Sequence, residues 1–355
     1  MENLWGEIKA IYDKLQDEES KYIFRRRMSY CLCHNDIEPI YEMVTHRDEN
    51  TERGFYDLIK NREKYKDKEI VLFGAGFYGK LHRKVFEQYK ISGIVAYCDN
   101  NPELWGKQVC NTLVMPVDEA VDKYPNAIYI IESANFWKEM RTQLLKSGVD
   151  EKNIISIFVS SELFGRQYFD TEIIKPIKDG VFIDGGCFDL SDTLEFIMFN
   201  PNFKRVYAFE PDKKNYAQCL AKIPCKQKNK IVIENKGLWH ENKQLSFNSN
   251  SSSSMITENG GDRIDVVSLD EYFDYDEKIT FIKMDIEGAE LKALQGAKQL
   301  ISRDKPDLAI CIYHRDEDIV NIPRYILELN PHYKLYIRHY SCYVQETVLY
   351  AVSDK

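Results

Sequence analysis

Short apolar runs alternate with stretches of helical periodicity in two separate parts of the chain. The first part covers residues 68–160. Its candidate strands are the runs IVLFGAG (70–76), IVAYCD (94–99), AIYII (127–131) and IISIF (154–158). Strands that alternate with helices indicate a parallel sheet covered by helices. We therefore predict a Rossmann-like, doubly wound α/β domain at residues 68–160.

The same alternation starts again after a charged connector at residues 161–179. Five further candidate strands, with helices between most of them, lie at 181–184, 205–210, 230–235, 279–285 and 308–313. The last two candidates, at 333–340 and 346–352, are joined by only a short connection. Parallel strands need a crossover of about a dozen residues or more, so this pair predicts an antiparallel hairpin. Residues 180–355 are thus predicted to form a second Rossmann-like, doubly wound α/β domain.

The N-terminal segment has a different pattern. Residues 1–67 are helix-like, and an apolar stripe at helical spacing is formed by Leu4, Ile8, Ile11 and Leu15. Such a stripe is expected to pack against a domain of the same chain or against a partner chain. A homo-oligomer therefore remains an open alternative.

The composition of the chain limits the classes of partner and the cellular compartment that can be expected. The net charge of −9 argues against a nucleic-acid partner, because such proteins carry a basic stripe. No apolar run approaches the roughly 18 residues that a membrane span needs. Nine scattered cysteines, an odd number, are typical of reduced thiols in a cytoplasmic protein. The polar stretch 248–261, inside the second domain, is expected to be a long loop.

A glycine turn follows the first strand of the first domain. Gly74, Gly76 and Gly79 form a G-x-G-x-x-G pattern between a strand and a helix, the context in which dinucleotides bind. Asp99 ends the next strand, near the position of a ribose-binding acid. The turn holds no acid and suits phosphates, which predicts a nucleotide or a nucleotide-sugar as its ligand. The alternative is a purely structural turn, because such turns also persist in folds that bind nothing.

The second domain has a turn of opposite charge. The stretch VFIDGGCFDLSD contains Asp184, Asp189 and Asp192 but neither lysine nor arginine. Such a turn would repel a pyrophosphate and suits a ligand without phosphate that carries positive charge. S-adenosylmethionine has these properties, and Gly185 and Gly186 would let the backbone approach its methionyl part. The alternative is that Asp184 and Asp189 only cap the turn or the helix.

An acid follows the next strand as well. Glu210 closes that strand 26 residues after Asp184 (210 − 184). A carboxylate there can accept hydrogen bonds from both ribose hydroxyls of S-adenosylmethionine. We therefore predict Glu210 as the ribose ligand.

Titratable residues follow two later strands of the second domain. Asp285 ends the fourth strand, Glu287 and Glu290 come just after it, and His314 follows the fifth strand. The carboxyl ends of parallel strands share one rim, where ligands bind. We expect Asp285 to contact the donor or the acceptor, and Glu287 or His314 to be the general base. Asp285 and His314 would be only two ligands for a metal, so no metal is predicted.

Several motifs together resemble a known family. VFIDGGCFDLSDTLEF, VYAFEPD and ITFIKMDIEGAELKALQGA resemble, in this order, the FkbM-type S-adenosylmethionine-dependent methyltransferases, over about residues 165–355. The resemblance implies a seven-strand sheet ending in an antiparallel hairpin. It also implies O-methylation of hydroxyls on saccharides, glycoconjugates or natural products. Pro211 and Leu238 are implied as further cofactor contacts. Cys187 replaces the family's common alanine, and Leu190 and Ser191 stand where a glycine is usual.

The first domain is similar, more loosely, to small Rossmann domains fused to glycan-modifying enzymes, some of which bind nucleotide-sugars. FGAGFYGK and YCDNNPELWGK carry this similarity. Two other functions stay open. One is a nucleotide-sugar-binding or NAD(P)-binding enzyme that uses the first turn and has an accessory second domain. The other is a scaffold protein with two degenerate clefts.

Overall fold

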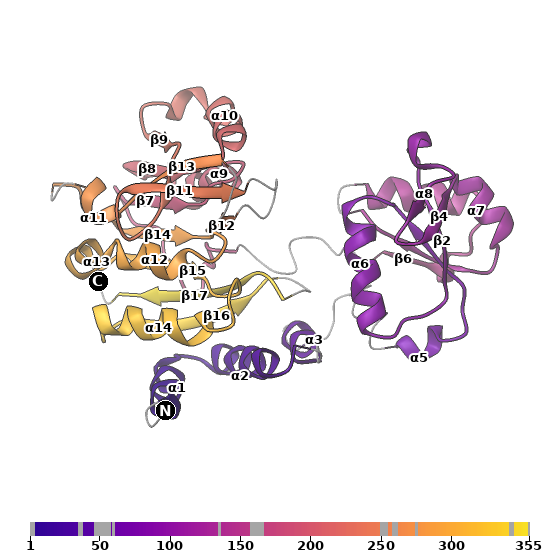
Figure 1. Ribbon diagram of the computed structural model, residues 1–355, viewed down its shortest axis with the longest axis horizontal. Helices are drawn as coiled ribbons and strands as arrows, with labels where there is room; N and C mark the ends of the chain where they lie inside the picture. The colour runs from indigo at the N-terminus through magenta and orange to yellow at the C-terminus, as the bar shows by residue number, and fades with distance from the viewer. Residues whose placement is uncertain are drawn as a thin grey trace. The chain divides into compact units, whose positions relative to one another are not determined.

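The chain folds into two compact units, Met1–Cys33 together with Phe164–Lys355, and His34–Leu163 (Figure 1). The computed structural model describes residues 4–34, 38–45, 58, 61–133, 136–156, 167–248, 255–257, 262–273, 276–340 and 344–353. Within these ranges, no helix combines the length and the apolar character that crossing a bilayer would require.

The unit His34–Leu163 is a mixed α/β structure. Its described helices are α3 (Glu38–Thr45), α5 (Arg62–Tyr65), α6 (Phe77–Gln88), α7 (Val117–Lys123) and α8 (Trp137–Lys146). Its described strands are β1 (Ile70–Phe73), β2 (Ile94–Cys98), β3 (Gln108–Val109), β4 (Thr112–Met115), β5 (Ile128–Ile131) and β6 (Ile154–Ser156). The sheet order is β3-β4-β2-β1-β5-β6, with every pairing parallel except β3 with β4. The four predicted strands are confirmed, and the β3–β4 hairpin is added.

The larger unit is built on a seven-stranded sheet. Its strands are β7 (Val181–Gly185), β8 (Arg205–Phe209), β9 (Ile231–Glu234), β14 (Phe281–Met284), β15 (Asp307–Cys311), β16 (Lys334–His339) and β17 (Thr347–Val352). The order is β16-β17-β15-β14-β7-β8-β9. β17 is antiparallel to both β15 and β16, and the other pairings are parallel. The predicted sheet with its final antiparallel hairpin is confirmed.

Helices connect and flank these strands. They are α1 (Leu4–Lys14), α2 (Glu18–Leu32), α9 (Ser191–Phe199), α10 (Lys213–Lys222), α11 (Leu269–Tyr272), α12 (Glu290–Gln295), α13 (Lys298–Asp304) and α14 (Asp318–Leu329). Aromatic rings hold α9 on the sheet: Phe182 of β7 stacks on Phe196 of α9 at 4.3 Å and on Phe281 of β14 at 5.3 Å. All three are buried. Because this packing fixes both ends of the β7–α9 turn, the turn is held rigidly on the sheet.

The N-terminal helices α1 and α2 belong to the larger unit, where they lie next to α14 and β16 (Figure 1). Leu15, between the two helices, forms a parallel bridge with Leu335 of the edge strand β16. Asp17 caps α2, and its Oδ2 accepts a hydrogen bond from Arg338 at 2.8 Å. The apolar stripe is only partly covered, since Leu15 is buried whereas Leu4 is 51% exposed. The helices thus cover an edge strand that would otherwise be open to pairing.

A small sheet inserted between β9 and β14 is absent from the sequence prediction. It has the order β10-β13-β11-β12, with β10 (Gly237–Leu238), β11 (Lys243–Asn248), β12 (Met255–Thr257) and β13 (Asp262–Val267). The loop expected at 248–261 is therefore wrong for residues 255–257, which pair with β11. The remainder of that stretch, apart from residue 248, lies outside the described residues.

Candidate active site

The predicted site residues of the larger unit lie at one edge of the seven-stranded sheet. Gly185 ends β7, Glu210 follows β8, and Asp285 follows β14. β7 lies between β8 and β14, so the strand order reverses at this point. In open α/β sheets, ligands bind at the carboxyl ends of the strands where such a reversal occurs.

The glycine turn after β7 is packed tightly against its neighbours. A Cβ atom on Gly185 would lie 2.8 Å from Cδ1 of Leu238, and one on Gly186 would lie 1.9 Å from the carbonyl oxygen of Asp285. Gly186 also has a φ of +76°, which residues with side chains rarely adopt. Both glycines are therefore required for the turn to contact β10 and the end of β14. This packing keeps Leu238 and Asp285 directly beside the turn.

Two carboxylates of the acidic turn are paired with Lys283, a buried residue of β14. Its Nζ lies 3.1 Å from Oδ1 of Asp184 and 2.9 Å from Oδ2 of Asp192, and it donates to the carbonyl oxygen of Gly186. Asp184 is fully buried and also accepts a 2.7 Å hydrogen bond from Thr193. The argument that three acids make this turn selective for a cation is therefore wrong for Asp184 and Asp192, because both are already paired with a lysine of the protein.

Asp189 is engaged within the protein as well. Its Oδ2 lies 2.7 Å from Nζ of Lys222, and its Oδ1 accepts the backbone N–H of Ser191. Burial by itself would raise the pKa of Asp189, but these two donors outweigh it and the pKa is lowered. Asp189 therefore stabilises the turn before α9 and ties it to Lys222 of α10.

Glu210 lies under the same turn with 5% of its surface exposed. It accepts backbone N–H groups from Phe188 at 3.0 Å and from Asp212 at 2.8 Å. Burial nevertheless raises the pKa of Glu210 to about 7. Each carboxylate oxygen can accept more than one hydrogen bond, so each can also accept a hydroxyl. Asn235 donates to the carbonyl oxygens of Glu210 and Pro211, which fixes the position of this segment.

The Asp285 carboxylate is held by two tyrosines that the sequence analysis missed. Tyr168 donates to Oδ2 at 2.8 Å, and Tyr313 donates to Oδ1 at 3.1 Å. The Tyr168 ring also lies 5.0 Å from Nζ of Lys283, a cation–π contact that links Asp285 to the acidic turn. Tyr168 comes from the predicted connector, 117 residues away from Asp285. No local spacing in the sequence signals such a contact.

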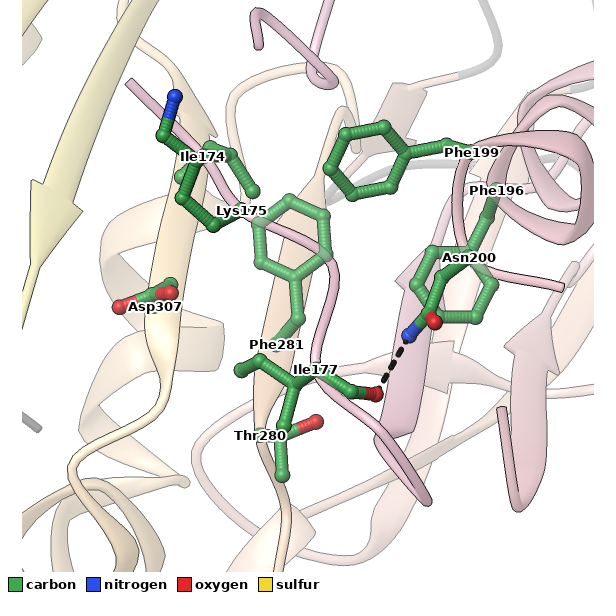
Figure 2. Close-up of a pocket in the computed structure, with 9 residues that line it drawn as sticks. All are labelled: Ile174, Lys175, Ile177, Phe196, Phe199, Asn200, Thr280, Phe281 and Asp307. Carbon is green, nitrogen blue, oxygen red and sulfur yellow. Dashed lines mark hydrogen bonds between the residues drawn. The ribbon is translucent and has the colours of Figure 1, made fainter. Parts of the chain in front are cut away.

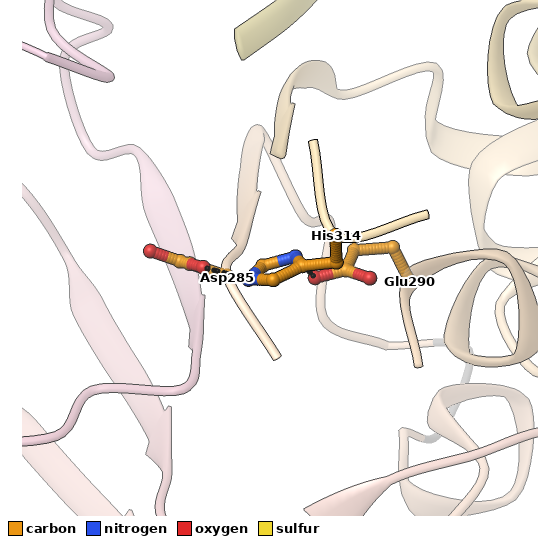
Figure 3. Close-up of side chains that lie close together, drawn as sticks. All are labelled: Asp285, Glu290 and His314. Carbon is orange, nitrogen blue, oxygen red and sulfur yellow. Dashed lines mark ion pairs between the residues drawn. The ribbon is translucent and has the colours of Figure 1, made fainter. Parts of the chain in front are cut away.

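His314 lies within a group of three carboxylates, two of which are drawn with it in Figure 3. Its Nε2 is 3.4 Å from Oδ1 of Asp285 and 3.5 Å from Oε2 of Glu287, and its Nδ1 is 3.0 Å from Oε1 of Glu290. Burial would lower the pKa of His314, but the three carboxylates outweigh burial and raise it to about 9. His314 is therefore a cation at neutral pH, and a cationic imidazole has no nitrogen free to accept a proton.

Glu287 and Glu290 differ in their surroundings. Glu287 has a left-handed φ of +56° and lies in the turn before α12, with 33% of its side chain exposed. Burial of the remainder raises its pKa. Glu290 is fully buried as the first residue of α12, and its Oε1 accepts the backbone N–H of Ile286 at 2.8 Å. Of the two, Glu287 is the carboxylate that a substrate can reach.

One further acid near this group was not predicted. Glu346, in the connection between β16 and β17, accepts a hydrogen bond from Gln167. Burial, together with the charge of Asp285, raises the pKa of Glu346 to about 7. The hairpin therefore adds a second carboxyl group beside Asp285.

The glycine turn of the smaller unit has a different structure. A Cβ atom on Gly79 would lie 2.0 Å from the carbonyl oxygen of Gly74, so packing of α6 on the sheet accounts for Gly79. A Cβ atom on Gly76 would meet nothing within 4 Å. Asp99 accepts the backbone N–H of Ala75 at 2.7 Å through one oxygen and another backbone N–H through the other. The acid predicted to bind a ribose therefore supports its own turn.

The hollow shown in Figure 2 is not a donor site. Its lining includes Thr280, which precedes β14, and Asp307, which begins β15, so it lies at the opposite edge of the sheet from Asp285. Its volume of about 10 Å³ is room for roughly one water molecule.

Comparisons with known proteins find solved structures to which the chain is similar. The chain is similar to the crystal structure of methyltransferase FkbM from Methylobacillus flagellatus KT, with a TM-score of 0.49 and 19% identity over 83% of this chain and 93% of that one. An rRNA methylase from Streptococcus thermophilus gives a TM-score of 0.35 and 16% identity over 53% of this chain and 93% of that one. Aeropyrum pernix fibrillarin, solved with natively bound S-adenosyl-L-methionine, gives a TM-score of 0.31 and 11% identity over 50% of this chain and 67% of that one.

No curated protein sequence matches the chain. A family model does match part of it: the model described as the methyltransferase FkbM domain aligns with residues 185–337. This range begins at the glycine turn and includes both Glu210 and the His314 carboxylate group. Residues 185–337 of this chain are therefore similar to the methyltransferase FkbM domain.

Proposed function

We propose that the protein is an S-adenosylmethionine-dependent methyltransferase that methylates a hydroxyl group on a saccharide, a glycoconjugate or another natural product. The observation that carries the proposal is the proximity of two groups within the FkbM domain. The glycine turn packs directly on Asp285, and Asp285 lies 3.4 Å from His314. A donor held at the turn would therefore present its methyl group to the carboxylates around His314.

The residues at the turn fit this donor. Glu210 has acceptor capacity left for two ribose hydroxyls, and it lies one strand away from the turn. Pro211 and Leu238 are proposed to contact the adenosyl part, and Gly185 and Gly186 its methionyl part. Asp285 would accept from the α-ammonium group, while Asp184 and Asp189 shape the turn. The donor supplies an electrophilic methyl group when it is bound.

Transfer to oxygen requires that the acceptor hydroxyl be aligned and lose its proton. Positioning can supply about 7–11 kcal/mol of the barrier, and a general base adds 10²–10⁴-fold. Of the two predicted bases, Glu287 is the better candidate, because His314 is already protonated at neutral pH. The proton of the hydroxyl would pass to Glu287, and the His314 cation would stabilise the Glu287 carboxylate before transfer.

Replacement of Glu287 by glutamine is expected to lower turnover about 10²–10⁴-fold, because glutamine cannot accept the proton. Donor affinity should stay within about threefold of the wild type, since Glu287 lies on the acceptor side of Asp285. Steady-state kinetics and calorimetry with S-adenosylhomocysteine measure the two effects. A Glu287→Gln variant that keeps wild-type turnover would exclude Glu287 as the base.

Donor affinity is expected to rise with pH. The pKa of Glu210 is about 7, and only its ionised form accepts hydrogen bonds from both ribose hydroxyls. The ionised fraction increases from about a tenth at pH 6 to about nine tenths at pH 8, so affinity should rise nearly tenfold over this range. Calorimetry with S-adenosylhomocysteine measures the rise. In Glu210→Gln, which does not titrate, the slope should disappear, and a slope that persists would assign it to another group.

The runner-up function, a nucleotide-sugar or NAD(P) enzyme that uses the smaller unit, has weaker support because Asp99 is engaged in its own turn. Calorimetry of the full-length protein with S-adenosylhomocysteine, NAD and UDP-sugars separates the two functions. Binding of S-adenosylhomocysteine alone supports the methyltransferase. Binding of NAD or a UDP-sugar without S-adenosylhomocysteine would overturn it.

A further inference from the structure

One residue of the glycine turn after β7 has both a strained backbone and an exposed side chain. Phe188 has a left-handed φ of +45°. It is the first central residue of a tight turn in which the N–H of Leu190 donates to the carbonyl oxygen of Cys187 at 2.6 Å. A positive φ at this position is found mostly for glycine, asparagine and aspartate, and for a bulky side chain it is an outlier. The turn therefore carries an aromatic ring where its backbone favours a glycine.

The strained conformation of Phe188 is held by residues of two other segments. The N–H of Phe188 donates to Oε2 of Glu210 at 3.0 Å, and its carbonyl oxygen accepts a hydrogen bond from Sγ of Cys219 at 3.2 Å. Cys219 is a buried residue of α10, so both polar groups of the Phe188 backbone are fixed from outside the turn. Backbone strain that the surroundings maintain in this way is concentrated at binding and catalytic sites.

The ring of Phe188 contributes less to the hydrophobic core than the rings near it in the fold. Phe188 is 49% exposed, whereas Phe182 of β7 and Phe196 of α9 are buried. A half-exposed ring gives up much of the hydrophobic stabilisation that burial of a phenylalanine provides. The residue lies just after the carboxyl end of β7, at the edge of the sheet where ligands bind. A ligand that covers the ring would explain both the strain and the exposure.

We propose that Phe188 is a further donor-binding residue, whose ring covers the adenosyl group of S-adenosylmethionine. Glu210 identifies the occupant, because the carboxylate that accepts the N–H of Phe188 is also the one proposed to bind the ribose. A ribose held by its hydroxyls on Glu210 has C–H groups left to contact a neighbouring ring, and the negative face of an aromatic ring attracts them. This role rests on the proposed function, because it requires that the donor binds at the glycine turn.

The test is titration calorimetry with S-adenosylhomocysteine on the full-length variants Phe188→Ala, Phe188→Gly and Phe188→Tyr, with folding checked by circular dichroism. The alanine and glycine variants lack the ring and should bind about 10–100-fold more weakly, which corresponds to covering the exposed half of a phenyl ring. Tyrosine keeps the ring, so Phe188→Tyr should bind within about threefold of the wild type.

Unfolding in urea separates the role of the ring from that of the backbone. Glycine adopts a left-handed φ without the clash of a Cβ atom, so Phe188→Gly should have a higher unfolding midpoint than Phe188→Ala. The two variants should nevertheless lose the same affinity for S-adenosylhomocysteine. If Phe188 only shaped the turn, affinity would follow stability, and Phe188→Gly would bind more tightly than Phe188→Ala.

The matched control is Met198→Ala, which removes an apolar side chain that is 69% exposed on α9. Its affinity should equal that of the wild type. The inference is overturned if folded Phe188→Gly and Phe188→Ala bind as tightly as the wild type, if their affinities follow their stabilities, or if Met198→Ala loses as much affinity. A wild type that binds no S-adenosylhomocysteine would reject the donor site as well, whereas full affinity without the ring rejects only the role of Phe188.

Discussion

Replacement of Glu210 by alanine is expected to weaken the binding of S-adenosylhomocysteine about 10²–10³-fold at pH 8, where the wild-type carboxylate is ionised. Each hydrogen bond to a charged acceptor contributes about 1.5–3 kcal/mol, so two ribose hydroxyls contribute about 3–5 kcal/mol before non-additivity. At 1.4 kcal/mol per decade, this gives the stated loss of affinity. Titration calorimetry of the purified full-length protein measures it.

The matched control for this experiment is Glu328→Ala, which removes an acid that is 62% exposed on the outer helix α14. Its affinity should equal that of the wild type. Circular dichroism should confirm that Glu210→Ala is folded, because Glu210 also accepts the N–H groups of Phe188 and Asp212. If a folded Glu210→Ala variant binds S-adenosylhomocysteine as tightly as the wild type, the proposed donor site is wrong. The hypothesis of a nucleotide-sugar enzyme then gains support.

Replacement of Lys283 by methionine is expected to destabilise the larger unit by about 3–5 kcal/mol. Methionine fills much of the same volume but leaves the buried Asp184 and the partly buried Asp192 without a counter-charge, and an uncompensated buried charge costs this much. Urea denaturation followed by circular dichroism measures the loss as a fall in the midpoint of unfolding.

Two variants show whether charge is the cause. Lys292 is an exposed lysine of α12, and its replacement by methionine should change the free energy of unfolding by no more than about 0.5 kcal/mol. Adding Asp184→Asn and Asp192→Asn to Lys283→Met should recover most of the lost stability, because no charge is then left unpaired. A loss below about 1 kcal/mol in Lys283→Met would mean that the two aspartates do not depend on this lysine.

The local pattern of apolar and polar residues was sufficient to predict most strands of the main sheets. The alternation of apolar runs with helical stretches predicted four strands of the smaller unit and the seven strands of the larger sheet, but not the β3–β4 hairpin. The short link before β17 predicted the antiparallel hairpin at the end of the chain. The carboxyl ends of the strands then indicated the rim that carries Glu210, Asp285 and His314. These predictions succeed because strand and helix periodicity, and the direction of a strand, are properties of neighbouring residues. The small sheet was missed because β10 and β12 span only Gly237–Leu238 and Met255–Thr257.

The local sequence pattern could not predict how the charged side chains at that edge of the sheet pair with one another. Lys283 lies 99 residues from Asp184, and Arg338 lies 321 residues from Asp17, so neither ion pair has a signal in local spacing. A lysine in the middle of an apolar strand was a hint that it would need buried partners. The resemblance to a family supplied the donor but not the lysine that pairs with two carboxylates of the acidic turn.

By itself, the sequence determined which residues lie at the ends of strands and therefore which side chains can meet at one edge of the sheet. Only the tertiary structure decided their chemical state. His314 was predicted as a possible base, but three carboxylates within 3.5 Å raise its pKa to about 9 and make it a cation. The physical reason is that pKa values and ion pairing depend on distance and burial in three dimensions, and segments far apart in the chain determine both.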